Sequence, residues 1–272
     1  HEIAAGLAHF EGDLERQVAH LLEALADTTS DATALNLAAL RDIQLTGPER
    51  HRALARALQL THGSRDPAVA SASAAIAISL FSESGRYGPM ETLVEDELPP
   101  LRMALIGTWD NDQGKGFETV RPPEEGVVLD AVYPGSVVEI SWRTEVPLSR
   151  QGLMALDALM SPNSWATAYA TAVVEADQAG AQELRMTTGS PFKVWLNGQL
   201  IASVEERRAT TTFDGYVLPL TLQAGPNRLL VKLAHRKGAW VFRPRLTGPG
   251  GAELVGVRVT AADHPVPSRT QA

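Results

Sequence analysis

Cysteine is absent from this chain of 272 residues. Its absence excludes disulfide bonds, thiolate metal sites and cysteine nucleophiles. A lack of cysteine is compatible with an exported bacterial protein, and we expect a periplasmic or extracellular location rather than a cytoplasmic one.

Long apolar runs are absent as well. No run approaches the 18 uninterrupted apolar residues of a membrane-spanning helix, so the sequence predicts no transmembrane segment. The N-terminal run HEIAAGLAHFEGDLERQ lacks the basic patch and apolar core of a secretion signal. The chain also begins without an initiator Met, and we expect it to be part of a longer gene product.

The common catalytic motifs are missing too. The sequence contains no G-x-S-x-G, no glycine-rich phosphate loop and no H-E-x-x-H, and its scattered histidines form no H-x-x-x-H pair. The adjacent pairs Glu124-Glu125 and Glu205-Glu206 do not suit glycoside hydrolysis, because two carboxyl groups must converge on one bond and neighbours on a strand face opposite ways. We therefore predict that the fragment itself is not an enzyme and carries no cofactor.

Lysine is missing from the first hundred residues. Residues 1–100 contain 15 Asp and Glu against 7 Arg, whereas residues 101–272 contain 17 acidic and 17 basic residues. The whole net charge of −8 therefore lies in the first part of the chain. This excess of negative charge argues against nucleic acid or an anionic membrane as a partner, and it is typical of solvated helix surfaces.

Residues 8–98 show a helical period, with apolar residues recurring every three or four positions. Asp66-Pro67 is typical of a helix start and Gly63 of a helix end, while Pro99-Pro100 stops the pattern. Short turns between helices of 12 to 17 residues favour stacked helical hairpins of the tetratricopeptide-like, α-solenoid kind. The apolar faces lie in the segments 10–25, 35–43, 54–60, 69–80 and 90–98.

After Pro99-Pro100 the period changes to two, which indicates short strands. Turns follow every 8 to 12 residues, as in an antiparallel β-sandwich of the jelly-roll type. The predicted strands are Val137–Trp142, Ala168–Val174, Glu183–Thr187, Phe192–Leu196, Leu200–Val204, Tyr216–Leu222, Arg228–Ala234, Trp240–Arg245 and Glu253–Val259.

The sequence thus predicts an α + β protein with its two classes in separate domains. We place a repeat-like helical domain at 1–100, a β-sandwich at 101–262 and a polar, proline-containing linker or tail at 263–272.

The strongest local signal is Asn197-Gly198, which lies between two strand-like runs and predicts a two-residue hairpin with positive φ. A second turn is expected at Gly225-Pro226-Asn227, before a strand in which Leu229, Val231 and Leu233 alternate inward. Most residues of these patterns are expected to support the scaffold.

The runs VWLNGQLIAS and AGPNRLLVKLAH resemble the jelly-roll, galactose-binding-like module attached to β-galactosidases and other glycoside hydrolases. Trp195, Asn197 and Gly198 match the first part of that pattern. Gly225, Asn227 and alternate apolar residues after them match the second. The resemblance covers about 55 residues and implies a non-catalytic, sugar-binding fold.

Two further resemblances involve neighbouring segments. The W-L-N-G hairpin is similar to that of PA14-like lectin modules, but Thr187-Thr188-Gly189-Ser190 stands where those modules carry a calcium-binding Asp pair. Residues 104–250 resemble the leader regions of large bacterial proteins in which helical repeats and a sandwich precede transglutaminase-like modules. That resemblance implies a non-catalytic fragment.

The most polar, glycine-rich segment runs from Trp109 to Gly116. With Trp165 it forms our candidate ligand site, in which Trp109 and Trp165 stack on a sugar while Asn111 and Asp112 bond hydroxyls or a cation. Calcium is possible through Asp110, Asp112 and Glu118, although their spacing is not that of an EF-hand. The alternatives are a turn that satisfies its own backbone and tryptophans that belong to the core, as we expect for Trp142, Trp195 and Trp240.

Two functions remain open. The first is a binding or scaffolding fragment of a larger bacterial protein, with helices that contact a protein partner and a sandwich that binds carbohydrate or protein. The second is an accessory region of a glycoside hydrolase or transglutaminase-like enzyme whose catalytic domain lies outside this chain. The basic turn His235-Arg236-Lys237 suits either a solvated hairpin tip or contact with an anionic group.

Overall fold

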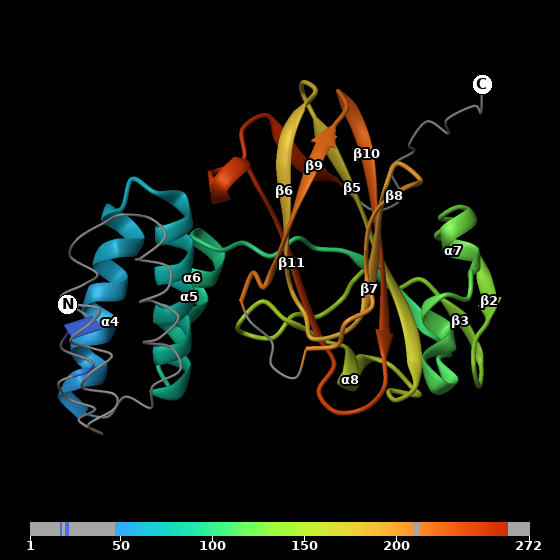
Figure 1. Ribbon diagram of the computed structural model, residues 1–272, viewed down its shortest axis with the longest axis horizontal. Helices are drawn as coiled ribbons and strands as arrows, with labels where there is room; N and C mark the ends of the chain where they lie inside the picture. The colour runs from blue at the N-terminus through green and yellow to red at the C-terminus, as the bar shows by residue number, and fades with distance from the viewer. Residues whose placement is uncertain (1–16, 18–19, 22–46, 209–212, 261–272) are drawn as a thin grey trace. The chain divides into compact units, whose positions relative to one another are not determined.

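The computed structural model describes residues 17, 20–21, 47–208 and 213–260 (Figure 1). The chain divides into two compact units: His1–Pro99 with Gly250–Ala252, and Pro100–Pro249 with Glu253–Ala272. Most of the first two predicted helices, and the predicted tail at 263–272, lie outside the described residues.

The described part of the first unit is helical. Its helices are α4 (Gly47–Gly63), α5 (Pro67–Glu83) and α6 (Tyr87–Asp96), and α5 packs against both of the others. Asp66 caps α5 by accepting a hydrogen bond from the backbone N–H of Ala68 at 2.9 Å, as the Asp-Pro pattern predicts. Within the described ranges, each helix is too short or too polar to cross a membrane. The repeat-like pairing of the helices stays a prediction.

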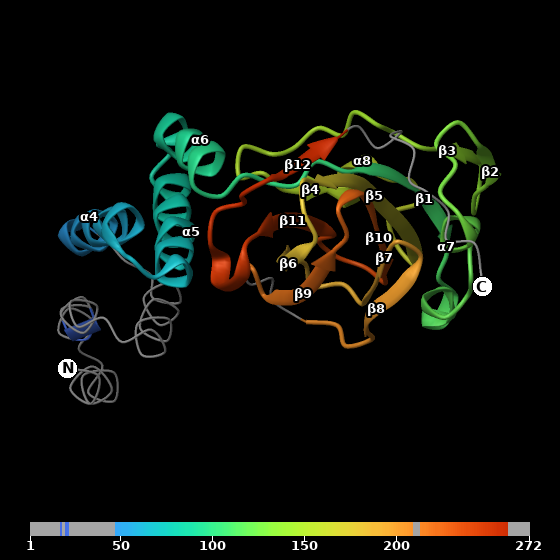
Figure 2. The same cartoon turned by 90° about the horizontal axis from the view of Figure 1, so that it is seen from above.

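The second unit is built on two antiparallel sheets that face each other across a common core (Figure 2). The six-stranded sheet has the order β1-β5-β10-β7-β8, and β12 pairs with β5 beyond the start of β1. Its strands are β1 (Ala104–Asp110), β5 (Ala166–Ala176), β7 (Phe192–Leu196), β8 (Gln199–Val204), β10 (Gly225–His235) and β12 (Val257–Thr260).

The smaller sheet has the order β4-β11-β6-β9. Its strands are β4 (Met154–Ala155), β6 (Gly180–Thr187), β9 (Tyr216–Leu222) and β11 (Val241–Thr247), and the short helices α8 (Leu156–Leu159) and η2 (Pro249–Gly251) lie in the connections. The prediction of an antiparallel β-rich unit after the helices is confirmed. The predicted strand Glu253–Val259 begins only at Val257.

The central strands β5 and β10 are buried on both faces. One face fills the core between the sheets, where Leu229, Val231 and Leu233 point inward as predicted. The other face lies under a third layer formed by residues 111–143, so Tyr169 and Leu230 are buried as well. Burial on both sides explains why β5, with the sequence ATAYATAVVEA, shows little polar alternation.

The third layer consists of η1 (Asp112–Phe117), α7 (Pro122–Glu125) and the hairpin of β2 (Val132–Pro134) and β3 (Glu139–Ser141). Figure 2 shows α7, β2 and β3 outside the six-stranded sheet. An aromatic cluster joins this layer to the sheet. Its buried members are Ala104, Ile106, Trp109, Ile140, Trp142, Tyr169, Trp195 and Leu230.

A buried ion pair fixes the third layer to the middle of the sheet. The Lys232 side chain has no exposed area, and its Nζ donates to Glu124 Oε1 at 2.8 Å and to the Thr119 carbonyl at 2.7 Å. The Tyr169 hydroxyl donates to the same Glu124 oxygen. Burial, and then this bond, raise the pKa of Tyr169, while burial lowers the pKa of Lys232. One carboxylate therefore satisfies two buried groups from two neighbouring strands.

The two conspicuous turns of the sequence meet in space. Asn197 and Gly198 form the predicted two-residue turn, with φ of +51° and +78°. Asn197 Nδ2 donates to Asn227 Oδ1 at 3.0 Å, and Asn197 Oδ1 accepts from the N–H of Arg228 at 2.8 Å. Fully buried Asn227 also accepts from the N–H of Gln223 and donates to the carbonyls of Gln223 and Gly225. The pair thus ties the β7–β8 hairpin to the β9–β10 connection.

We predict that Glu124→Gln destabilises the sandwich by about 3 kcal/mol, because it leaves the Lys232 cation buried without a counter-charge. The neighbouring Glu125 is exposed, so Glu125→Gln is the matched control and changes stability by less than about 0.5 kcal/mol. All five tryptophans lie in the second unit, so denaturation followed by tryptophan fluorescence reports on this unit. Equal losses in the two variants would contradict a stabilising role for the pair.

We predict that Asn227→Ala lowers the free energy of unfolding by about 2 to 4 kcal/mol, because it breaks several hydrogen bonds and leaves buried polar groups without a partner. Asn163 is exposed and makes one side-chain bond, to the Asp157 carbonyl. Asn163→Ala is therefore the control and costs under about 1 kcal/mol. The same fluorescence-detected unfolding compares them, and a loss for Asn227→Ala as small as that for Asn163→Ala sinks the prediction.

Candidate functional site at one end of the sandwich

The register of the strands brings several loops together at one end of the sandwich. Asp110 at the end of β1, Ala166 at the start of β5 and His235 at the end of β10 lie side by side across the sheet. The turn from β10 to β11 and the chain that leads into β5 therefore meet at this end (Figure 1). The loop after β1 joins them, and it contains the predicted site residues.

Trp165 is the exposed aromatic residue at this end. Its backbone N–H donates to the Arg236 carbonyl at 2.6 Å, and its own carbonyl accepts from the N–H of Asn111 at 2.8 Å. Its φ is +50°, a left-handed conformation that a bulky residue rarely adopts. The side chain remains 42% exposed. The indole thus projects from a backbone that two neighbouring loops hold on both sides, in agreement with its predicted place among exposed loops.

Trp109 does not share this exposure, and the stacking role predicted for it is corrected. Only 4% of the residue is exposed, and its ring packs edge-on against Tyr169 at 5.4 Å between centroids. The reason is the third layer, because it covers the face of β1 from which this side chain projects.

Asn111 holds the loops together, and its predicted contact with a ligand hydroxyl is corrected. The residue is 2% exposed, and its Nδ2 donates to the His235 carbonyl at 2.9 Å. Gly116 passes so close that an added Cβ would lie 2.8 Å from Asn111 Oδ1. Only glycine allows that approach. Asn111 and Gly116 thus build the loop that positions Trp165.

The carboxylates proposed for calcium do not converge. Asp110 Oδ2 accepts from the backbone N–H of exposed Asp112 at 3.2 Å, whereas Glu118 forms an ion pair with Lys193 at 2.7 Å. Across the described ranges, no three His, Asp or Glu side chains gather in a way that holds a metal ion. The predicted Asp110, Asp112 and Glu118 set therefore does not form a calcium site in this arrangement.

Basic residues form a rim at this end, next to the backbone of Trp165, which bonds the Arg236 carbonyl. Arg236 and Lys237 lie in the exposed turn after β10, and an added Cβ at Gly114 would lie 3.7 Å from Arg236 Nη2, so this guanidinium reaches the loop after β1. Arg207, which follows β8, donates from Nη2 to the Lys237 carbonyl at 3.1 Å. The sequence marked the His235-Arg236-Lys237 turn, but it gave no sign of Arg207, because this residue is 30 positions away from its partner.

His235 supports the rim from below. Its ring is buried and stacks on Trp240, with 4.8 Å between centroids and 4° between planes. Burial lowers the pKa of His235; its bond with the Gly238 backbone opposes this, and the nearby charges of Arg207, which lowers the pKa, and Asp157, which raises it, act in opposite directions. The imidazole is therefore neutral near pH 7 and acts as an apolar platform under the turn.

The exposed groups at this end include the Trp165 indole, the guanidinium groups of Arg207 and Arg236, the ammonium groups of Lys115 and Lys237, and carboxylates of the loop after β1 such as that of Asp112. Such groups bind by stacking and by charge-assisted hydrogen bonds.

We predict that the sandwich loses stability as the pH falls below about 6.5, because the unfolded His235 then takes up a proton that the folded, depressed-pKa imidazole resists. His235→Gln removes this contribution, so its deficit in unfolding free energy against the native chain is largest near pH 8 and shrinks toward pH 5. Fluorescence-detected denaturation at pH 5, 6, 7 and 8 measures it. Exposed His51→Gln is the control, and a deficit for His235→Gln that stays constant with pH refutes the linkage.

Comparisons with known proteins give weak, local similarities. No family model and no curated protein matches the chain. Among solved structures, the PA14 domain of the antifreeze protein MpAFP aligns at 19% identity and a TM-score of 0.29, over 37% of this chain and 54% of that one. A family 35 carbohydrate-binding module from an environmental isolate aligns at 16% identity and a TM-score of 0.27, over 35% of this chain and 71% of that one. A β-glucosidase from Kluyveromyces marxianus aligns at 14% identity and a TM-score of 0.33, over 53% of this chain and only 16% of that one.

Proposed function

We propose that the β-sandwich is a non-catalytic carbohydrate-binding module whose ligand rests on Trp165. The observation that carries the proposal is the exposed indole of Trp165, held by backbone hydrogen bonds to Arg236 on one side and Asn111 on the other. A rigid aromatic ring offers a large contact area at a low cost in conformational entropy. The apolar face of a sugar ring complements such a surface.

The charges around Trp165 favour sugars that carry a negative group. Arg236 and Lys237 lie in the turn that bonds the Trp165 backbone, and Arg207 bonds the same turn, while the loop after β1 contains the exposed Lys115, Asp112 and Glu118. A guanidinium binds a carboxylate or sulfate through paired hydrogen bonds. We therefore propose that acidic oligosaccharides bind more tightly than neutral ones, and that the difference shrinks as salt is added.

A binding role without turnover is supported by the chemistry of this rim. Glycoside hydrolysis needs two carboxyl groups on either side of the scissile bond. Asp110 accepts the backbone N–H of Asp112, and Glu118 is ion-paired with Lys193, so two of the carboxylates of this loop already have partners within the fold. In our proposal the chain serves as an accessory part of a larger protein that acts outside the cytoplasm, with any catalytic domain elsewhere in that protein.

We predict that Trp165→Ala weakens sugar binding at least tenfold and leaves the fold intact, because the ring is exposed and its backbone makes the structural bonds. Isothermal titration calorimetry with neutral and acidic oligosaccharides, with and without calcium, compares the affinities of the variant and the native chain, and nuclear magnetic resonance of the indole N–H groups locates the ligand on the native chain. The Trp165 signal should move, whereas those of buried Trp142 and Trp240 should not.

The matched control is Tyr87→Ala, which removes a comparably exposed aromatic ring from α6 and should leave binding unchanged. Arg236→Gln should weaken binding of acidic sugars and spare that of neutral ones. Sugar binding that survives Trp165→Ala, or a panel in which nothing moves the Trp165 signal, disproves the proposed site.

A further inference from the structure

A cavity lies in the second unit, and none of its lining residues belongs to the loop end with Trp165. Its volume is about 370 Å³, and it lies between residues 102–103 and 144–148. The first segment begins beside β11, where the Leu101 N–H donates to the Pro244 carbonyl, and leads into β1. The second starts at Arg143, which pairs with Leu105 of β1, and leads to β4. Each segment therefore passes from one sheet to the other, and the cavity opens between them.

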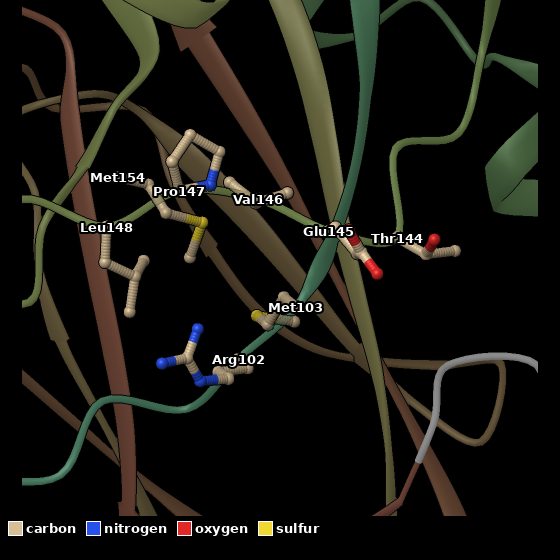
Figure 3. A pocket seen from close by; sticks show the side chains of 8 residues that line it. All are labelled: Arg102, Met103, Thr144, Glu145, Val146, Pro147, Leu148 and Met154. Atoms are coloured by element: carbon tan, nitrogen blue, oxygen red, sulfur yellow. The ribbon is translucent and has the colours of Figure 1, made fainter.

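The cavity is apolar inside. Met103 and Met154 form its base, and both are buried members of the core between the sheets. Val146, Pro147 and Leu148 line one side, as Figure 3 shows. Methionine side chains are flexible and polarizable, so this base can adapt to aliphatic groups of different shape.

One cation faces this apolar space. Figure 3 shows the Arg102 guanidinium beside Leu148 and Met154, whereas the Glu145 carboxylate points away on the opposite side. Arg102 and Glu145 form no ion pair with each other, and in the described part of the chain Arg102 has no acidic partner within 4.0 Å. A guanidinium beside an apolar cavity is suited to a carboxylate attached to an aliphatic group.

We propose that this cavity binds a small amphiphile whose aliphatic body enters between Met103 and Met154 and whose carboxylate pairs with Arg102. The volume lies at the lower end of the range for small-molecule sites, about 300 to 1,000 Å³. Two sources share this chemistry: a free aliphatic acid, and the C-terminal carboxylate of a peptide that ends in an apolar residue.

The five methionines provide the readout. In the full chain labelled with ¹³C at the methionine methyl groups, titration with octanoate should shift the signals of Met103 and Met154. Those of Met90, Met160 and Met186 lie outside the cavity and should stay in place. Single Met→Leu substitutions assign the signals. Octanol and octylammonium, which lack the anion, should cause much smaller shifts at the same concentration.

Charge variants test the role assigned to each rim residue. Arg102→Gln should weaken octanoate binding about tenfold, in line with the loss of a charged hydrogen bond. Glu145→Gln should leave binding unchanged or strengthen it, because it removes a negative charge near an anion. The controls are Arg258→Gln and Glu139→Gln, which change exposed charges of the same unit outside the cavity.

N-acetyl-leucyl-leucine distinguishes the two sources. Tighter binding of this peptide than of octanoate assigns the site to a peptide terminus, and the reverse order assigns it to a free acid. The proposal is overturned if neither probe moves Met103 and Met154 selectively, if Arg102→Gln binds as tightly as the native chain, or if Glu145→Gln weakens binding. All these readouts are independent of Trp165.

Discussion

The ion pair between Lys232 and Glu124 connects the middle of the six-stranded sheet to the layer that covers it. A lysine with no exposed side-chain area is tolerated because Glu124 and the Thr119 carbonyl both accept from its ammonium group. The covering layer begins at Asn111, so the contact that secures the layer also secures the loop beside Trp165. The exposed ring at the loop end thus depends on a charge buried in the sheet below.

The two ends of the sandwich use their polar groups in different ways. At one end, Asn197 and Asn227 bind each other and the backbone around them, so their polar groups are used within the fold. At the other end, the backbone bonds of Asn111, Trp165 and Arg236 hold the loops while the Trp165 ring and the Arg236 side chain remain exposed. Polar groups used internally stabilise one end, whereas the other end keeps exposed side chains on a backbone that hydrogen bonds hold in place.

Local patterns predicted most of the scaffold. The Asn-Gly turn, the inward alternation from Leu229 to Leu233 and the cap at Asp66 each depend on a few neighbouring residues, and the structure has all three. The predicted strand Val137–Trp142 contains β3, but the third layer as a whole was missed, because its other short elements carry little periodicity of their own. Trp109 was misjudged as a result: its polar neighbours indicated a loop, whereas the layer that buries it is formed by residues up to 33 positions further along. Arg207 belongs to the rim only because the folded chain brings it to the turn after β10, so no local sequence pattern could indicate its place.

The paths of β1 and β12 along β5 bear on how the sandwich is attached to the rest of its chain. Both strands pair with β5 in the same direction, β1 with residues 166–171 and β12 with residues 173–176. Ala104, where β1 enters the sheet, pairs with Thr171, and Thr260, where β12 ends, pairs with Val173. The start of β1 and the end of β12 are therefore neighbours on one edge of the sheet, and β12 and β1 together resemble one strand with a break in it. A circular permutant that joins Thr260 to Ala104 and opens an exposed turn elsewhere would keep every strand pairing, and the same geometry lets the module be inserted within a host chain without separating the two points of attachment.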